Sequence, residues 1–167
     1  MSRILVFFIS LFLMTAVLTS CEKIDDSRIP PVNVNLTFTS GEWATYGVGG
    51  ALEHKRFINS RTNIVPSNFP YKVTSYTGYG GILLIGNLYG FPMAYDLSCP
   101  YEAKPDIRVE IDDRTHDAVC PKCGSVYDVF GGDGRPTGGP SAEYGYGMTR
   151  YKVLEGNDAL NYRLITR

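Results

Sequence analysis

Two cysteine-proline boxes stand in the middle of this chain: Cys99-Pro100-Tyr101 and Cys120-Pro121-Lys122-Cys123-Gly124-Ser125, with 20 residues between Cys99 and Cys120. Each box follows a short apolar run. Between the boxes, residues 107–111 alternate apolar with charged side chains and lead into Asp112-Asp113-Arg114, a pattern typical of a β-hairpin. We therefore expect the boxes to form two loops that lie side by side at one end of a sheet.

Outside the boxes, short strand-like runs recur between Gly, Pro, Asn and Asp residues, and helical periodicity is almost absent. The runs cover residues 34–39, 71–76, 82–85, 92–95, 107–111, 126–129, 150–154 and 162–166. The 18 Gly and 10 Pro residues suit many short strands joined by tight turns. The sequence predicts an all-β fold, a small antiparallel β-sandwich or barrel. The Gly-rich segment 131–141 is predicted as an ordered loop.

The two boxes resemble those of the Rieske-type iron-sulfur family. In that family a Cys-x-His box and a Cys-x-x-His box place two thiolates on one iron of a 2Fe-2S cluster and two imidazoles on the other. The likeness extends over roughly residues 80–155, where Gly138-Gly139-Pro140-Ser141 resembles the loop that covers the cluster. It implies a Rieske-like β fold with two cluster-binding loops, and electron transfer as the role. It also implies that the hydroxyls of Ser125 and Tyr127 hydrogen-bond a bridging sulfide and a cysteine sulfur.

Both imidazole positions of the family are replaced here. Tyr101 stands at the first and Cys123 at the second. By the resemblance, Cys99 and Cys120 would hold one iron, while Cys123 and Tyr101 would hold the other. A phenol, with an ordinary pKa of ~10, binds iron less readily near neutral pH than imidazole does. The candidate cofactor site thus comprises Cys99, Tyr101, Cys120, Cys123, Ser125 and Tyr127.

Three neighbouring thiolates also suit zinc, which accepts three Cys ligands completed by another donor. A third interpretation has no cofactor, with a disulfide joining two of the three cysteines, since an odd number cannot all pair in an oxidising compartment. Three interpretations therefore remain: an iron-sulfur electron carrier, a zinc-stabilised module and a cofactor-free interaction module. A redox dithiol at positions 120 and 123 is disfavoured, because no helix is predicted after it. His54 and His116 are expected at the surface, not as ligands.

The start of the chain predicts a lipoprotein. After Arg3, residues 4–18 carry no charge, and the run closes on Leu18-Thr19-Ser20-Cys21. This is the pattern of a signal peptide with a lipobox, and the apolar run is shorter than the ~20 residues of a membrane-spanning helix. We expect a signal peptide at 1–20, a lipid on Cys21, a tether at 21–33 and a β domain at 34–167. The acidic residues after Cys21 resemble an export tag of Bacteroidetes-type lipoproteins.

The expected location is the bacterial cell envelope, on the periplasmic face or at the outer membrane, with the lipid as the contact to the bilayer. Removing Arg3 with the signal peptide leaves 15 Lys and Arg against 17 Asp and Glu, a net charge of about −2. Without a basic excess, nucleic acid is not an expected partner. Hydroxyl and carboxylate side chains form no catalytic set, and the redox or protein partner is not identified by the sequence.

Overall fold

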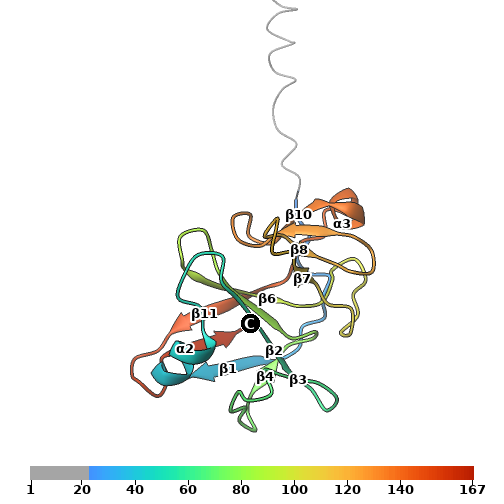
Figure 1. Ribbon diagram of the computed structural model, residues 1–167. Helices are drawn as coiled ribbons and strands as arrows, with labels where there is room; N and C mark the ends of the chain where they lie inside the picture. Colours follow the sequence, from blue (N-terminus) through green and yellow to red (C-terminus); the bar gives the residue numbers. More distant parts are fainter. Residues whose placement is uncertain (1–22) are drawn as a thin grey trace, which may run out of the picture.

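The computed structural model describes residues 23–167, so the predicted signal peptide and the lipidation site Cys21 lie outside the described residues. The described chain is mostly β and forms a curled sheet of 8 strands with a second sheet of 4 strands beside it (Figure 1). The predicted all-β class is confirmed. None of the helices within residues 23–167 has the length and apolar character needed to cross a bilayer.

The large sheet is antiparallel throughout, in the order β3-β2-β5-β6-β11-β12-β1-β4. Its strands are β1 (Val34–Phe38), β2 (His54–Asn59), β3 (Ile64–Val65), β4 (Tyr76–Thr77), β5 (Ile82–Gly86), β6 (Pro92–Asp96), β11 (Arg150–Glu155) and β12 (Arg163–Thr166). The sheet curls until its ends meet: the Asn59 side chain donates to the Ser75 carbonyl at 2.9 Å, and the Asn59 backbone donates to Thr77 at 3.0 Å.

The small sheet carries the second cysteine box. Its order is β10-β9-β8-β7, with β7 (Glu110–Ile111), β8 (Ala118–Val119), β9 (Val126–Asp128) and β10 (Arg135–Gly138). Strands β7 and β8 form the hairpin predicted between the boxes, with Glu110 opposite Val119. Its turn is closed by a hydrogen bond from Asp112 N to Asp117 O at 2.9 Å.

Strand β5 explains how the two sheets are joined. All five of its residues are buried, because each face of the strand meets a different core. Ile82 and Leu84 belong to an aromatic core under the large sheet, while Leu83 and Ile85 belong to the core that also contains the cysteines. A strand buried on both faces reads as a continuous apolar run, as this one does.

The aromatic core is built around three phenylalanines in edge-to-face contact. The ring centroids of Phe38 and Phe57 are 5.4 Å apart, and Phe69 lies 5.4 Å from the first and 5.2 Å from the second. Such pairs contribute about 0.5–1.5 kcal/mol each beyond the burial of their area. This core lies on one face of β5, opposite the core that contains the cysteines.

Two helices within the described residues were not predicted. Helix α2 (Ser40–Tyr46) starts at a capping box in which Thr39 and Glu42 each satisfy the other's backbone N–H. Helix α3 (Gly139–Tyr144) follows β10 directly. The segment 131–141, expected as a loop, thus contains a strand and the start of a helix. Pro140 at the beginning of α3 is compatible with this, because a proline in the first turn removes no helical hydrogen bond.

The strand predicted at 71–76 was wrong. Residues there form a turn, in which Ser75 N donates to Lys72 O at 2.9 Å and Lys72 N to Ser75 Oγ at 2.9 Å. Val73, at the tip of this turn, is 98% exposed. The Ser hydroxyl offers the backbone a local partner, which competes with strand pairing. Only Tyr76 and Thr77 pair, as β4.

Part of the segment 21–33, expected as a tether, packs on the domain. Asp25 N donates to Gly145 O at 2.8 Å, Gly147 N donates to Asp25 O at 2.9 Å, and Thr149 Oγ1 donates to Asp26 O at 2.6 Å. Ile29 is fully buried. The described chain is therefore held against the end of α3 from Asp25 onward.

Candidate metal centre

Two loops present the cysteines. The first begins where β6 ends and carries Cys99, whose backbone N–H donates to Ile107 O at 2.9 Å. The second connects β8 to β9 and carries Cys120, whose N–H donates to Ser125 O at 2.8 Å. Each loop is thus closed by its own backbone, and the two loops face each other. Cys99 and Cys120 belong to the core that also contains Leu83 and Ile85.

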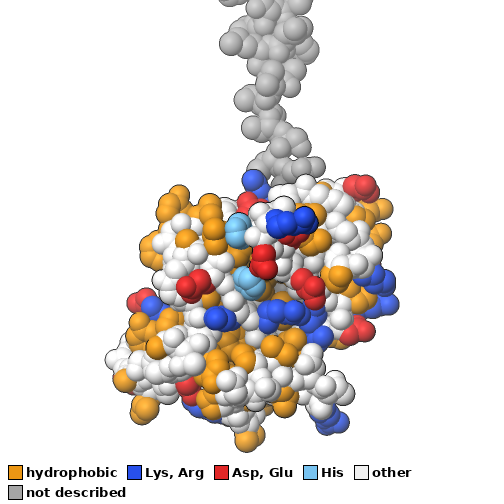
Figure 2. All heavy atoms as spheres, in the orientation of Figure 1, with side chains coloured by type: hydrophobic (Ala, Val, Ile, Leu, Met, Phe, Trp, Pro, Cys, Tyr) orange, Lys and Arg blue, Asp and Glu red, His pale blue; other side chains and the backbone are white. Residues whose placement is uncertain are grey.

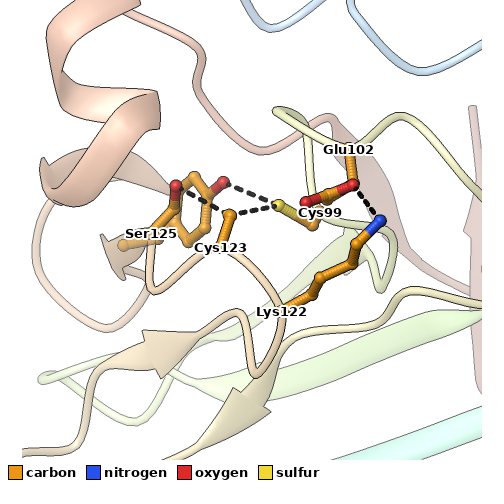
Figure 3. A network of polar contacts seen from close by, with 6 residues as sticks. Cys99, Glu102, Lys122, Cys123 and Ser125 are labelled. Atoms are coloured by element: carbon orange, nitrogen blue, oxygen red, sulfur yellow. Dashed lines mark hydrogen bonds and ion pairs between the residues drawn. The ribbon is translucent and has the colours of Figure 1, made fainter.

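The sulfur atoms of Cys99, Cys120 and Cys123 all lie within 4.8 Å of one another. This confirms the predicted convergence. Cys99 and Cys120 are buried, and Cys123 is half-buried. Cys99 Sγ and Cys123 Sγ are 3.6 Å apart and point toward each other (Figure 3). Within residues 23–167 all three are free thiols, since a disulfide needs a separation of about 2.05 Å. The group could hold a metal ion.

Hydroxyl groups surround the sulfur atoms. The hydroxyl of Tyr127 lies 3.4 Å from Cys99 Sγ and 2.6 Å from Ser141 Oγ. The Cys123 thiol donates to Ser125 Oγ at 3.1 Å, and Ser125 Oγ also accepts from Ser141 N at 3.0 Å. If Cys123 becomes a thiolate, the Ser125 hydroxyl can turn to donate to it. Helix α3, which begins just before Ser141, therefore holds both hydroxyls in place.

The pKa values of the two facing thiols, Cys99 and Cys123, are shifted in opposite directions. Burial raises the pKa of Cys99 to about 12, and hydrogen bonds from Tyr127 and the Glu102 backbone oppose that rise. Partial burial also acts to raise the pKa of Cys123, but hydrogen bonds with Ser125, Cys120 and Cys99 outweigh it, and the pKa lies below its ordinary value. Burial raises the pKa of the Tyr127 phenol, so its hydroxyl stays protonated as a donor.

A buried carboxylate that the sequence did not single out anchors the first loop. Asp96 is fully buried at the end of β6. Its oxygens accept from the backbone N–H groups of Tyr79 at 3.0 Å, Gly80 at 3.1 Å and Ser98 at 2.7 Å, and from the Tyr151 hydroxyl. A buried charge is tolerated when it is hydrogen-bonded on all sides, as here. Asp96 thus fixes the backbone immediately before Cys99.

Tyr101 lies at the rim of the site. Its side chain is 38% exposed, and its ring centroid lies 6.1 Å from that of Tyr144 in α3. The next residue, Glu102, is directed inward, and its Oε2 lies 2.8 Å from Lys122 Nζ in the second loop (Figure 3). The two histidines are at the surface (Figure 2), with His116 at the hairpin turn against the Phe130 ring.

No family model, curated protein or solved structure matches this chain. The conclusions about the site therefore rest on its own geometry and on the residues of the two boxes.

Proposed function

We propose that this domain binds one metal ion, zinc in first place, through Cys99, Cys120 and Cys123. The observation that carries the proposal is the mutual proximity of the three sulfur atoms, all within 4.8 Å. With Zn–S bonds of ~2.3 Å, two ligands of one tetrahedral ion lie about 3.8 Å apart. The separation of 3.6 Å between Cys99 Sγ and Cys123 Sγ is close to this value.

The same distance favours one ion over a two-iron cluster. In the family arrangement Cys99 and Cys123 would belong to different irons, which are separated by the bridging sulfides. Here the two sulfur atoms are as close as two ligands of a single ion. Tyr101, the partner expected for Cys123, is 38% exposed and faces Tyr144. The donor set therefore fits three thiolates on one centre better than two pairs of ligands.

A Rieske-like electron carrier is the second candidate. It is favoured by the hydroxyls of Tyr127 and Ser125, which lie 3.4 Å from Cys99 Sγ and 3.1 Å from Cys123 Sγ. Hydrogen bonds to the sulfur atoms are one means by which proteins tune iron-sulfur potentials. In a zinc site the same bonds would offset the negative charge of the thiolates and hold their orientation.

We further propose that the domain acts in the bacterial envelope, held at a bilayer through a lipid on Cys21. Zinc bound by three thiolates neither changes redox state nor, when its fourth position is filled by the protein, activates water. The domain would then act as a metal-stabilised module whose surface binds a protein partner near the membrane. The absence of a catalytic set in the sequence agrees with this role.

The test is metal analysis of the full chain, purified in detergent without oxygen, combined with its visible absorption spectrum. One zinc per chain and a colourless protein are expected. Cys99→Ser, Cys120→Ser and Cys123→Ser should each abolish metal binding, whereas Ser98→Ala should retain it. Ser98 is a suitable control because it is buried beside Cys99 and its hydroxyl has no partner in the described chain. Two irons per chain with a visible spectrum would establish the electron carrier, and a metal-free disulfide would establish the interaction module.

A further inference from the structure

The two cysteine loops have the same backbone turn. In the first, Ala103 N donates to Cys99 O at 2.9 Å, and in the second, Gly124 N donates to Cys120 O at 3.0 Å. The residue that closes each turn is left-handed, with φ of +48° at Ala103 and +71° at Gly124. Such a conformation is uncommon for a residue with a side chain, so its occurrence at Ala103 shows that the first loop is held to this geometry.

This equivalence assigns a counterpart to every residue of the second loop. Cys99-Pro100-Tyr101-Glu102-Ala103 matches Cys120-Pro121-Lys122-Cys123-Gly124 position by position. Glu102 therefore takes the place in the first loop that Cys123 takes in the second. A Cys-x-x-ligand spacing from each of two facing loops is the usual source of four ligands for a tetrahedral ion.

The burial and contacts of the Glu102 side chain are those of a ligand and not of a surface residue. Only 13% of it is exposed, although a Glu side chain is normally solvated. Its backbone N–H is hydrogen-bonded to Cys99, which ties the residue to the sulfur site. Oε2 is paired with Lys122 Nζ at 2.8 Å. A carboxylate has two oxygens, so this ion pair leaves Oε1 to bind an ion.

We infer that Glu102 is the fourth ligand of the metal centre, with Lys122 as the residue that positions its carboxylate. The inference rests on the proposed zinc site. Zinc accepts a carboxylate oxygen at about 2.0–2.2 Å beside thiolates. The carboxylate lies outside the group of mutually close sulfur atoms, so binding requires a rotation of the Glu102 side chain toward Cys99 and Cys123. The Lys122 ammonium offsets part of the negative charge that a fourth anionic ligand adds.

The other oxygen and nitrogen donors near the site are less suitable. Tyr101 is 38% exposed, and its ring centroid lies 6.1 Å from that of Tyr144. His116 is exposed at the far end of the β7–β8 hairpin, where its ring contacts Phe130. Neither occupies a position equivalent to a cysteine in the opposite loop.

The test replaces zinc with Co²⁺ in the full chain and records two quantities, the metal affinity and the thiolate-to-cobalt charge-transfer intensity. The wild type should bind Co²⁺ with an intensity typical of three thiolates. Glu102→Gln should lower the metal affinity at least about tenfold, because even the loss of a residue that hydrogen-bonds a metal ligand lowers affinity 10–100-fold. The three-thiolate charge-transfer intensity should stay unchanged. Glu102→Cys should raise the charge-transfer intensity by about a third, since four thiolates replace three.

Glu110→Gln is the matched control. It makes the same chemical change at an exposed carboxylate of β7, 3.8 Å from Arg56, and should leave both quantities at wild-type values. If Glu102→Gln matches the wild type in affinity, or if Glu102→Cys keeps the three-thiolate intensity, the fourth ligand is not Glu102 and the inference is overturned. A wild type that binds no Co²⁺ or zinc would overturn the proposed function itself, a result distinct from the other two.

Discussion

Replacing Tyr151 with Phe tests how strongly the buried Asp96 carboxylate is held. Both residues are buried, at 3% and 0% exposure, and the Tyr151 hydroxyl donates to Asp96 Oδ2. The substitution removes one oxygen and leaves the ring in place. A hydrogen bond to a charged group contributes about 1.5–3 kcal/mol. The free energy of unfolding should fall by that amount, and the melting temperature by about 3–12 °C for a domain of this size.

Tyr95→Phe is the control for this prediction. Tyr95 is also fully buried, but its hydroxyl donates to a neutral acceptor, the carbonyl of Val129, at 3.1 Å. The expected loss is therefore about 0.5–1.5 kcal/mol. Urea unfolding followed by circular dichroism measures both values. If Tyr151→Phe costs no more than Tyr95→Phe, the Asp96 carboxylate does not depend on its hydroxyl partner, and the reasoning about the first loop fails.

The same two tyrosines make stability depend on alkaline pH. Burial raises the pKa of both Tyr95 and Tyr151 above the ordinary value of ~10. The unfolded chain then loses protons at lower pH than the folded chain. The contribution of each group is fully present below pH ~10 and is lost as the pH rises toward the folded pKa, at up to about 1.4 kcal/mol per pH unit. Urea unfolding at pH ~8 and ~11 should show this decline, with a smaller slope in Tyr151→Phe. Equal slopes in wild type and variant would contradict the assignment.

Three further predictions concern the site, the core and the anchor. Tyr101→His with Cys123→His should restore the Rieske ligand set and yield a Rieske-like visible spectrum after iron-sulfur loading; failure to bind iron would mean that the loops cannot hold a cluster. Phe57→Ala, at a fully buried position of the aromatic core, should cost about 3–5 kcal/mol in urea unfolding, and a loss below ~1 kcal/mol would be incompatible with that packing. Cys21→Ala should leave the precursor uncleaved and without lipid when the protein is examined by mass spectrometry, and normal cleavage would argue against the lipobox.

Local pattern was sufficient for the strands that bury a face, and insufficient where pairing is decided at long range. The run at 82–85 is apolar throughout and forms β5, whereas β2 begins with His54, Lys55 and Arg56 and gave no strand signal. Strand β2 forms because it pairs with β5 along four residues, from His54 opposite Ile85 to Phe57 opposite Ile82. That partner cannot be read from the charged residues of β2 itself.

The candidate site, too, could be predicted only in part from local sequence patterns. The three cysteines could be predicted to converge, because two Cys-Pro boxes flank a hairpin. The role of Asp96 could not be predicted, since nothing local indicates that Tyr151, 55 residues later, would donate to it. Glu102 did have a signal in the sequence. The five residues from Cys99 repeat the pattern of the five from Cys120, with Glu in place of the second Cys.

The packing of Asp25 against Gly145 and Gly147 limits how far the domain could stand from a membrane. Asp25 lies only four residues after Cys21, and an extended chain spans at most about 3.6 Å per residue. The segment from Cys21 to Asp25 would therefore span no more than about 14 Å. With a lipid on Cys21, the end of α3 would face the bilayer and the domain would have little freedom to swing.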